Sequence, residues 1–372
     1  MKTLLILGNG FDLNCELKSR FSDFFQTKLT TVYFNNKSGL DLKDRQKENI
    51  WYLIFLFAFY NNKLLDRETD ADTLFPSINK DNPLWMDVES YIKNIMTSKN
   101  KSLGKYMHAT SEKTFLDVFN LANDVREDYN HYLSEHYQFR RLQMNFIINE
   151  DIKKGKTMTE YLYHQLKLFE DDFRNYVLKE MKSKESDYNA NSKALLKRFR
   201  DYNGENLYLL TFNYTNPNAS VNDTINHVHG DLHSNSIIIG YDSSDINSNN
   251  NPALTLSKGW QKLFLGSRDI SLPSKESINC IKFYGHSLGE QDYSYFHALF
   301  DYYEVYSRNV TLIFYYSEYE DSVEKNEAIR ANYISRVYAL LDKYVEESEK
   351  ENKRRTFTSR LQLENRLKIQ KL

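Results

Sequence analysis

The sequence predicts an α/β fold, in which a Rossmann-like parallel sheet carries a long α-helical insertion and a helical C-terminus. The apolar run Leu4-Leu5-Ile6-Leu7 stops at glycines, as a strand buried on both faces of a parallel sheet does. Similar runs recur only beyond residue 200. Between about residues 20 and 200, glycine and proline are sparse and apolar residues recur at helical spacing.

The later apolar runs predict the remaining strands, at residues 207–212, 225–229, 236–239, 280–284 and 310–314. We therefore expect residues 1–35 and 205–318 to form a nucleotide-binding domain. Residues 36–204 are expected as a helical insertion subdomain with a core helix near 50–60, and residues 319–372 as C-terminal helices. Leu363 and Leu367 are expected to pack inward from an amphipathic helix, and residues 243–256 to form a mobile surface loop.

Charge and cysteine content narrow the function classes. The 372 residues include 49 Lys and Arg against 51 Asp and Glu, so no overall field draws the chain to nucleic acid or to an anionic membrane. The first apolar run is too short for a secretion signal, and residues 50–60 are too few to span a bilayer. The two cysteines, Cys15 and Cys280, cannot form a disulfide framework, and we expect both to be ordinary buried side chains in a cytoplasmic protein.

The loop Gly8-Asn9-Gly10-Phe11-Asp12 is the first candidate binding site. A strand that turns through two glycines into a helix allows an anion close to the backbone, so we expect ligand phosphates here. The third glycine of a full Gly-x-Gly-x-x-Gly pattern is missing. Asp12 either caps the helix or reaches a ribose hydroxyl, and a tight turn without a ligand stays open.

Two further candidates end predicted strands at the edge where open α/β sheets bind ligands. After the strand that ends near Thr211, Asn213 can hold a water or a substrate hydroxyl, or close the turn through its own backbone. Strand alternation is expected to point His227 and His229 to the same side, for acid-base or hydrogen-bonding chemistry. No matching set of zinc ligands accompanies them, so we expect no metal.

The fourth candidate, Tyr284 to Asp292, is again a strand, a glycine and a polar turn before a helix. Gly285 and Ser287 are placed to bind phosphate or ribose, and Asp292 to cap the following helix. Gly285-His286-Ser287-Leu288-Gly289 also has the spacing of a serine nucleophile elbow. Because only His297 follows in the chain, a Ser triad is disfavoured.

At these residues the sequence resembles the AbiH family of bacteriophage abortive-infection proteins. The segments that carry the resemblance are Leu5 to Leu13, Leu17, Ser22-Asp23-Phe24, Trp85 to Glu89, Thr211 to Thr215, His229-Gly230, and Gly285 to Leu288 with Asp292. Glu16 stands where the family tends to have glycine, which leaves the path of the first helix open. The order of motifs more distantly resembles the sirtuin-like NAD-binding superfamily, although the zinc-ribbon cysteines are missing and protein deacetylation is not implied.

The resemblance implies a residue-by-residue assignment. Gly8, Asn9 and Gly10 would meet the diphosphate of NAD⁺, with Phe11 and Asp12 beside it, and Gly285 and Ser287 would hold the adenosine side. Asn213 would position a water, and His229 would bind the ribose. Thr211, Tyr214, His286 and Asp292 complete the expected ligand contacts.

We therefore expect an antiphage enzyme, a hydrolase that cleaves the nicotinamide-ribose bond of NAD⁺. Two alternatives stay open, namely a non-catalytic nucleotide sensor and a metal-dependent nuclease that uses Asp87 and Glu89. These two carboxylates are two residues apart on a predicted helix and so do not share a face, which weakens the nuclease hypothesis. The expected partners are a small nucleotide and a phage-derived trigger, without membrane or nucleic acid, and assembly into a homo-oligomer is left open.

Overall fold

The computed structural model describes residues 2–32, 49, 51–52, 88–89, 92–93, 158–201, 206–234, 236–243, 252–266, 270–347 and 356–372. The chain divides into two units. Unit 1 comprises Met1–Ser19, Asn175–Ile237 and Gly266–Leu372, and unit 2 comprises Arg20–Arg174 and Ile238–Leu265. Each unit therefore draws on separate parts of the sequence.

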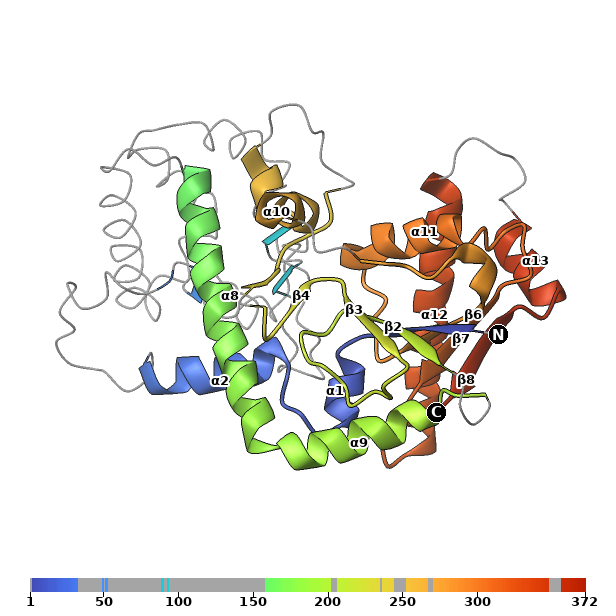
Figure 1. Ribbon diagram of the computed structural model, residues 1–372, viewed down its shortest axis with the longest axis horizontal. Coiled ribbons are helices and arrows are strands. Elements are labelled where there is room, and N and C mark those ends of the chain that lie inside the picture. The colour runs from blue at the N-terminus through green and yellow to red at the C-terminus, as the bar shows by residue number, and fades with distance from the viewer. Residues whose placement is uncertain are drawn as a thin grey trace, which may run out of the picture. The chain divides into compact units, whose positions relative to one another are not determined.

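Unit 1 contains a six-stranded parallel sheet (Figure 1). Its strands are β1 (Lys2–Leu7), β2 (Leu207–Thr211), β3 (Thr224–His227), β6 (Ile278–Tyr284), β7 (Thr311–Tyr316) and β8 (Leu367–Lys371), in the spatial order β3-β2-β1-β6-β7-β8. This is the strand order of doubly wound nucleotide-binding folds. The predicted Rossmann-like α/β fold is confirmed.

The first strand, β1, lies at the point where the strand order reverses. The next sheet strand along the chain, β2, pairs with one side of β1, and β6 pairs with the other. In open parallel sheets, ligands bind outside the carboxyl ends of the strands at this switch point. The loops that follow Leu7 and Tyr284 therefore lie where this topology places a ligand site.

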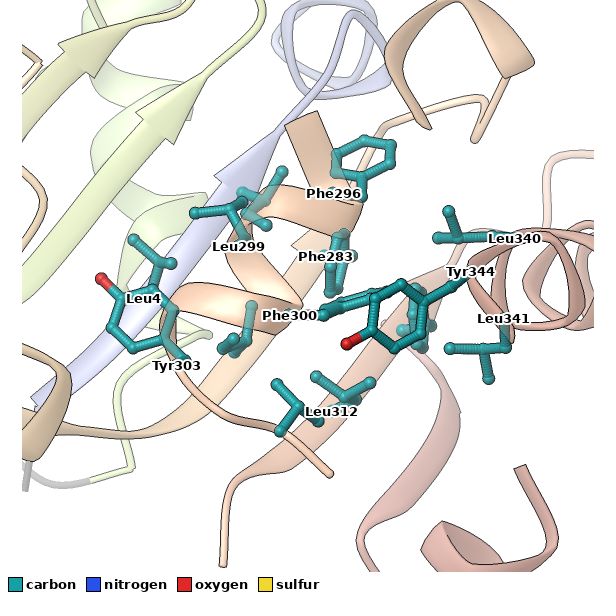
Figure 2. Close-up of a cluster of buried hydrophobic side chains, with 14 of the residues drawn as sticks. Leu4, Phe283, Phe296, Leu299, Phe300, Tyr303, Leu312, Leu340, Leu341 and Tyr344 are labelled. Atoms are coloured by element: carbon teal, nitrogen blue, oxygen red, sulfur yellow. The ribbon is translucent and has the colours of Figure 1, made fainter. Parts of the chain in front are cut away.

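Helices cover both faces of the sheet. Leu4 and Ile6 of β1 belong to a buried cluster with α11 (Tyr293–Tyr302), α12 (Val323–Glu347) and α13 (Phe357–Leu363) (Figure 2). Within this cluster Phe283 stacks on Phe314 at a centroid distance of 4.4 Å. On the other face, Phe199, just after α9 (Glu185–Lys197), packs its ring 5.1 Å from Tyr284.

The expected C-terminal helices are present as α12 and α13, and the edge strand β8 follows them at residues 367–371. The polar side chains of this strand, Lys368, Gln370 and Lys371, suit the edge of a sheet. The expectation that Leu363 packs inward was wrong, because its side chain is 89% exposed, whereas Leu367 packs against the core. Residues 236–239 do not add a strand to the sheet. Instead β4 (Gly230–Asp231) and β5 (Ser236–Ile237) form a separate antiparallel pair.

Unit 2 is held by an aromatic cluster on α2 (Phe21–Val32) and α8 (Met158–Ser183), the latter a helix that contributes residues to both units. Phe24 packs against Tyr52, Phe169 and Phe173, with centroid distances from 5.3 to 6.0 Å. Trp51 and Tyr52 are helical and buried, in line with the expected core helix, whose later residues lie outside the described ones.

The predicted loop at 243–256 is ordered at its end. Residues Pro252–Leu256 form the 3-10 helix η4, which precedes α10 (Lys258–Leu265), and Leu256 is fully buried. Residues 244–251 lie outside the described ones. Apolar burial therefore anchors the end of a segment whose polar composition had indicated a surface loop.

The length of the helices and the burial of the two cysteines bear on two further expectations. No helix among the described ranges combines the length and the apolar character needed to cross a bilayer. Cys15 is buried and Cys280 is half-buried, and both are free thiols. Burial, aided by the charge of Asp12, raises the pKa of Cys15 to about 12, so this thiol is not a reactive thiolate at neutral pH.

The cluster in Figure 2 gives the first prediction. Phe300 is fully buried within it, so Phe300→Ala is expected to lower the free energy of unfolding by about 3–5 kcal/mol through lost burial and a residual cavity. The control is Leu363→Ala, which removes an exposed side chain and is expected to change stability by less than about 0.5 kcal/mol. Urea unfolding followed by circular dichroism measures both, and equal losses would contradict the assigned packing.

Candidate functional site

The loops after β1 and β6 are in direct backbone contact at the switch point. The Gly10 amide donates to the Gly285 carbonyl at 2.7 Å, and the Gly8 amide donates to the Tyr284 carbonyl at 3.0 Å. A Cβ on Gly285 would lie 2.3 Å from the Phe11 nitrogen, and one on Gly8 would lie 2.4 Å from the Cα of His286. Side chains at these positions would force the loops apart, so glycine is needed for the loops to touch.

This contact changes the interpretation of the first glycine loop. The amides of Gly8 and Gly10 donate across the loop contact, and the Phe11 amide donates to the Gly8 carbonyl at 2.9 Å. The side chain of Asn9 accepts a hydrogen bond from the Ser19 hydroxyl at 2.5 Å. Binding of a diphosphate by Gly8, Asn9 and Gly10 stays a prediction, and it would need donors other than these three amides.

Asp12 lies inside the protein and does not cap its helix. Helix α1 (Gly10–Asn14) has Asn9 at its N-cap and no side-chain capping bond. The carboxylate of Asp12, 1% exposed, accepts hydrogen bonds of 2.8 Å from the hydroxyls of Tyr188 and Thr215. Burial raises the pKa of Asp12 to about 6, and the bonds from Tyr188, Thr215 and Asn213 limit the rise. This Asp12 network joins α1, α9 and the loop after β2.

Asn213 is fixed from three sides beside this network. Its backbone amide donates to the Thr211 hydroxyl at 3.0 Å, and its backbone carbonyl accepts from His227 Nδ1 at 2.9 Å. Its side-chain Nδ2 donates to the Gly8 carbonyl at 3.1 Å. These bonds orient the side chain and leave Oδ1 as its acceptor. An oriented side-chain oxygen of this kind can hold a water molecule by accepting a hydrogen bond from it.

His229 belongs to a second cluster, which we call the Asp292 cluster. Its members are Phe212, His229, His286 and Asp292. His229 Nε2 hydrogen-bonds Asp292 Oδ1 at 3.0 Å, and His286 Nε2 lies 3.3 Å from Asp292 Oδ2. The ring of Phe212 packs against both imidazoles, at centroid distances of 5.3 and 4.7 Å. Two imidazoles thus share one carboxylate at the carboxyl edge of the sheet.

His227 and His229 have different partners, although strand alternation was expected to place them together. Strand β3 ends at His227, whose Nδ1 and Nε2 contact Asn213 and the side chain of Asn216, whereas His229 contacts Asp292. No hydrogen bond joins Asn213 to His229 among the described residues. The predicted pair of catalytic residues therefore lies in two neighbouring clusters, linked through the chain from Thr211 to Thr215.

The other predicted site residues make backbone or surface contacts. Ser287 is exposed and its carbonyl accepts from Arg336, while the carbonyl of Tyr214 accepts from Leu232. His297, the one later histidine, points its Nε2 to the Leu340 carbonyl at 3.3 Å on α12. Ligand contacts by Thr211, Tyr214, Gly285 and Ser287 stay predictions.

One of the two carboxylates that the nuclease alternative would use is engaged in an ion pair. Within unit 2, Glu89 forms an ion pair of 2.7 Å with Lys258, an ammonium that is 1% exposed. Asp87 and Trp85 lie outside the described residues. In the described ranges, no group of three His, Cys, Asp or Glu side chains could hold a metal ion.

Sequence reasoning missed the partners of the two carboxylates. Tyr188 lies 176 residues from Asp12, on a helix that gave no local signal. The departure at Glu16, in contrast, has a physical meaning. Glu16 has a φ of 63°, in the left-handed region that favours glycine, where the chain leaves α1.

Comparisons with known proteins agree with the site motifs. The family model described as "Bacteriophage abortive infection AbiH" matches residues 4–316. No curated protein and no solved structure matches the chain. The matched range includes every residue of the Asp12 network and of the Asp292 cluster.

The loop contact yields a stability prediction. Gly285 has a φ of 71° as well as the close contact with Phe11, so Gly285→Ala is expected to cost on the order of 2–4 kcal/mol of unfolding free energy. Gly266→Ala is the matched control, because Gly266 has a φ of 78° but nothing within 4 Å of an added Cβ. It should cost only about 1–2 kcal/mol. Chemical denaturation separates the two, and an equal cost would contradict the steric role of Gly285.

The buried carboxyl of Asp12 predicts a pH dependence. Its pKa is about 6 in the folded chain against 3.8 ordinarily, so its contribution to stability is full below pH 3.8 and is lost as pH rises through 6. This difference corresponds to about 3 kcal/mol. Asp12→Asn keeps an acceptor for Tyr188 and Thr215 but cannot ionise. Relative to this variant, the wild-type chain should lose stability between pH 4 and pH 7.

Urea unfolding at several pH values tests this expectation. The control is Asp321→Asn, which changes an exposed carboxylate and should shift the stability curve little at any pH. A difference between the wild-type chain and Asp12→Asn that stays constant from pH 4 to pH 7 would show that Asp12 does not titrate in this way.

Proposed function

Because the chain belongs to the bacteriophage abortive infection AbiH family, we propose that this phage abortive-infection protein binds NAD⁺ at the switch point of its sheet and hydrolyses the nicotinamide-ribose bond. The observation that supports this proposal is the convergence of Asn213 and the Asp292 cluster beside the two touching loops. The order of these motifs is also similar to that of sirtuin-like NAD-binding proteins. The proposal does not depend on the glycine amides as a phosphate cradle.

The chemistry needs an oriented water and a stabilised ribose. The bond between C1′ and the nicotinamide nitrogen breaks, and its electron pair stays with the neutral nicotinamide that leaves. A water oxygen bonds to C1′ and a proton is released, which gives ADP-ribose. Positive charge builds on the sugar during this step, so fixed hydrogen-bonding groups lower the barrier.

Two residues of the chain suit these tasks. The Oδ1 of Asn213, in a residue fixed by two backbone bonds and one side-chain bond, would accept a hydrogen bond from the attacking water. His229 would hydrogen-bond a ribose hydroxyl. Both side chains are almost buried, with exposed fractions of 6% and 4%, and a site with little bulk water strengthens such polar contacts.

Abortive infection also requires control of the activity. NAD⁺ is abundant in the cytoplasm, so an enzyme that destroys it there must stay inactive until infection. We therefore propose that a phage-derived trigger activates the chain in the cytoplasm. Assays of the purified chain accordingly include lysate from infected cells as a source of the trigger.

The test is to incubate the full chain with NAD⁺, with and without lysate from infected cells, and to measure nicotinamide and ADP-ribose by mass spectrometry. His229→Ala and Asn213→Ala are each expected to reduce turnover about 100-fold or more. The matched control is His233→Ala, since His233 is exposed on the neighbouring turn and should be dispensable. Circular dichroism establishes that each variant is folded.

The outcomes separate the hypotheses. Release of nicotinamide that depends on Asn213 and His229 supports the enzyme. Binding of NAD⁺ by calorimetry without any release, under every activating condition, would instead place the chain in the sensor class. Absence of both binding and release would overturn the assignment of NAD⁺ to this site.

A further inference from the structure

We propose that Asp292 is a positioning residue, which fixes the proton of His229 on Nε2 and so presents Nδ1 to the ligand as a hydrogen-bond acceptor, with His286 as its second partner. This inference takes the location of the ligand from the proposed function. The position of the proton follows from contacts within the protein and can be measured without a ligand.

The side chain of Asp292 is diverted from its usual role. The residue occupies the N-cap of α11. Asp is among the most favoured residues at this position because its carboxylate can accept hydrogen bonds from the first backbone amides of the helix. Asp292 makes no such bond. Its two oxygens instead face His229 and His286, at 3.0 and 3.3 Å. A helix that forgoes its capping bond in this way loses about 1 kcal/mol, so the carboxylate serves another purpose.

The tautomer of His286 is set by the backbone. The Leu288 amide donates to His286 Nδ1 at 2.9 Å, so this nitrogen carries the lone pair. The proton of the neutral ring must then lie on Nε2, the nitrogen near Asp292 Oδ2. His286 therefore presents an N–H to Asp292 Oδ2, which acts as the acceptor.

A carboxylate oxygen that faces a ring nitrogen accepts a hydrogen bond from it, and this determines the tautomer of His229. The nitrogen that contacts Oδ1 at 3.0 Å is Nε2, so Nε2 carries the proton and the neutral ring has its lone pair on Nδ1. The ring is also held in orientation by Phe212 and by Tyr295, whose ring centroid lies 5.4 Å away. His229 is thus prepared as an acceptor with a fixed direction.

This arrangement names the chemical group that His229 recognises. A lone pair on Nδ1 attracts a hydrogen-bond donor, such as a sugar hydroxyl or a water, and repels a phosphate oxygen. If His229 takes up a proton from that hydroxyl, the resulting imidazolium lies next to the negative charge of Asp292, which stabilises it. Asp292 and His286 then act through His229 and do not contact the ligand.

Nuclear magnetic resonance tests the proton position directly. The full chain is labelled with ¹⁵N-histidine, and long-range ¹H–¹⁵N correlation spectra report which ring nitrogen is protonated, with His229→Gln and His286→Gln to assign the two signals. Both rings are expected to show protonated Nε2 and unprotonated Nδ1 near pH 8. A proton on Nδ1 of His229 in the wild-type chain would overturn the proposal, whatever the fate of any variant.

A mutant cycle tests whether Asp292 acts through His229. Asp292→Asn replaces one acceptor oxygen with a donor, so it is expected to change the His229 spectrum and to lower NAD⁺ turnover about 100-fold or more. In the His229→Ala background the same change should have less than about a twofold effect, because the two residues act as one unit. A full additional loss there would assign Asp292 to direct ligand contact and overturn the positioning role.

The experiments also separate this inference from the proposed function. If the chain never hydrolyses NAD⁺ but His229 shows the expected tautomer, lost in Asp292→Asn and kept in the exposed-site control Asp321→Asn, the positioning role stands and the activity does not. If NAD⁺ is hydrolysed and the tautomer is the opposite one, the activity stands and the role of Asp292 does not.

Discussion

The site depends on one close approach of backbone to backbone, between the loops that leave β1 and β6 at the reversal of strand order. Gly8, Gly10 and Gly285 allow the first loop to donate two backbone hydrogen bonds to the second, from Gly10 to the Gly285 carbonyl at 2.7 Å and from Gly8 to the Tyr284 carbonyl at 3.0 Å. A sheet of this topology would otherwise be open at this position, where nucleotide-binding folds place their ligands. The contact brings the main chain of the two loops together here, and Asn213 donates to the Gly8 carbonyl beside it.

Those side chains form two clusters, each built around a carboxylate that does not do what its position in the sequence suggests. Asp12 follows the N-cap of a short helix and Asp292 occupies the N-cap of another, yet neither caps. Asp12 is buried against the hydroxyls of Tyr188 and Thr215, and Asp292 accepts from His229. A buried carboxylate costs solvation energy, and an unused cap costs about 1 kcal/mol. Departures from local rules of this kind are typical of functional positions.

The fold was predictable to a large extent because a buried parallel strand leaves a local signature. Leu4 to Leu7 are buried on both faces of the sheet, and their continuous apolar run predicts this in the sequence. The strand β8 was missed, because its half-polar residues lie at a sheet edge and carry little apolar signal. In the candidate site, the motifs around Gly8, Asn213, His229 and Gly285 could be found for the same reason, since each closely follows the end of a strand. Their pairing could not, because Asp292 lies 63 residues from His229 in the chain.

A glycine pattern that resembles a phosphate-binding loop can also serve a contact within the protein. Glycine permits close approach by any group, and a sequence does not say whether that group is a ligand or another loop of the protein. Here the approaching group is the loop of Gly285, itself left-handed at a φ of 71°. The glycines of both motifs therefore serve one contact. Two polar side chains lie beside it, namely Asn213, which donates to the Gly8 carbonyl, and His286, whose Cα lies against Gly8. On this reasoning the two glycine motifs form a single structural unit, and in the proposed function Asn213 and His229 carry the chemistry.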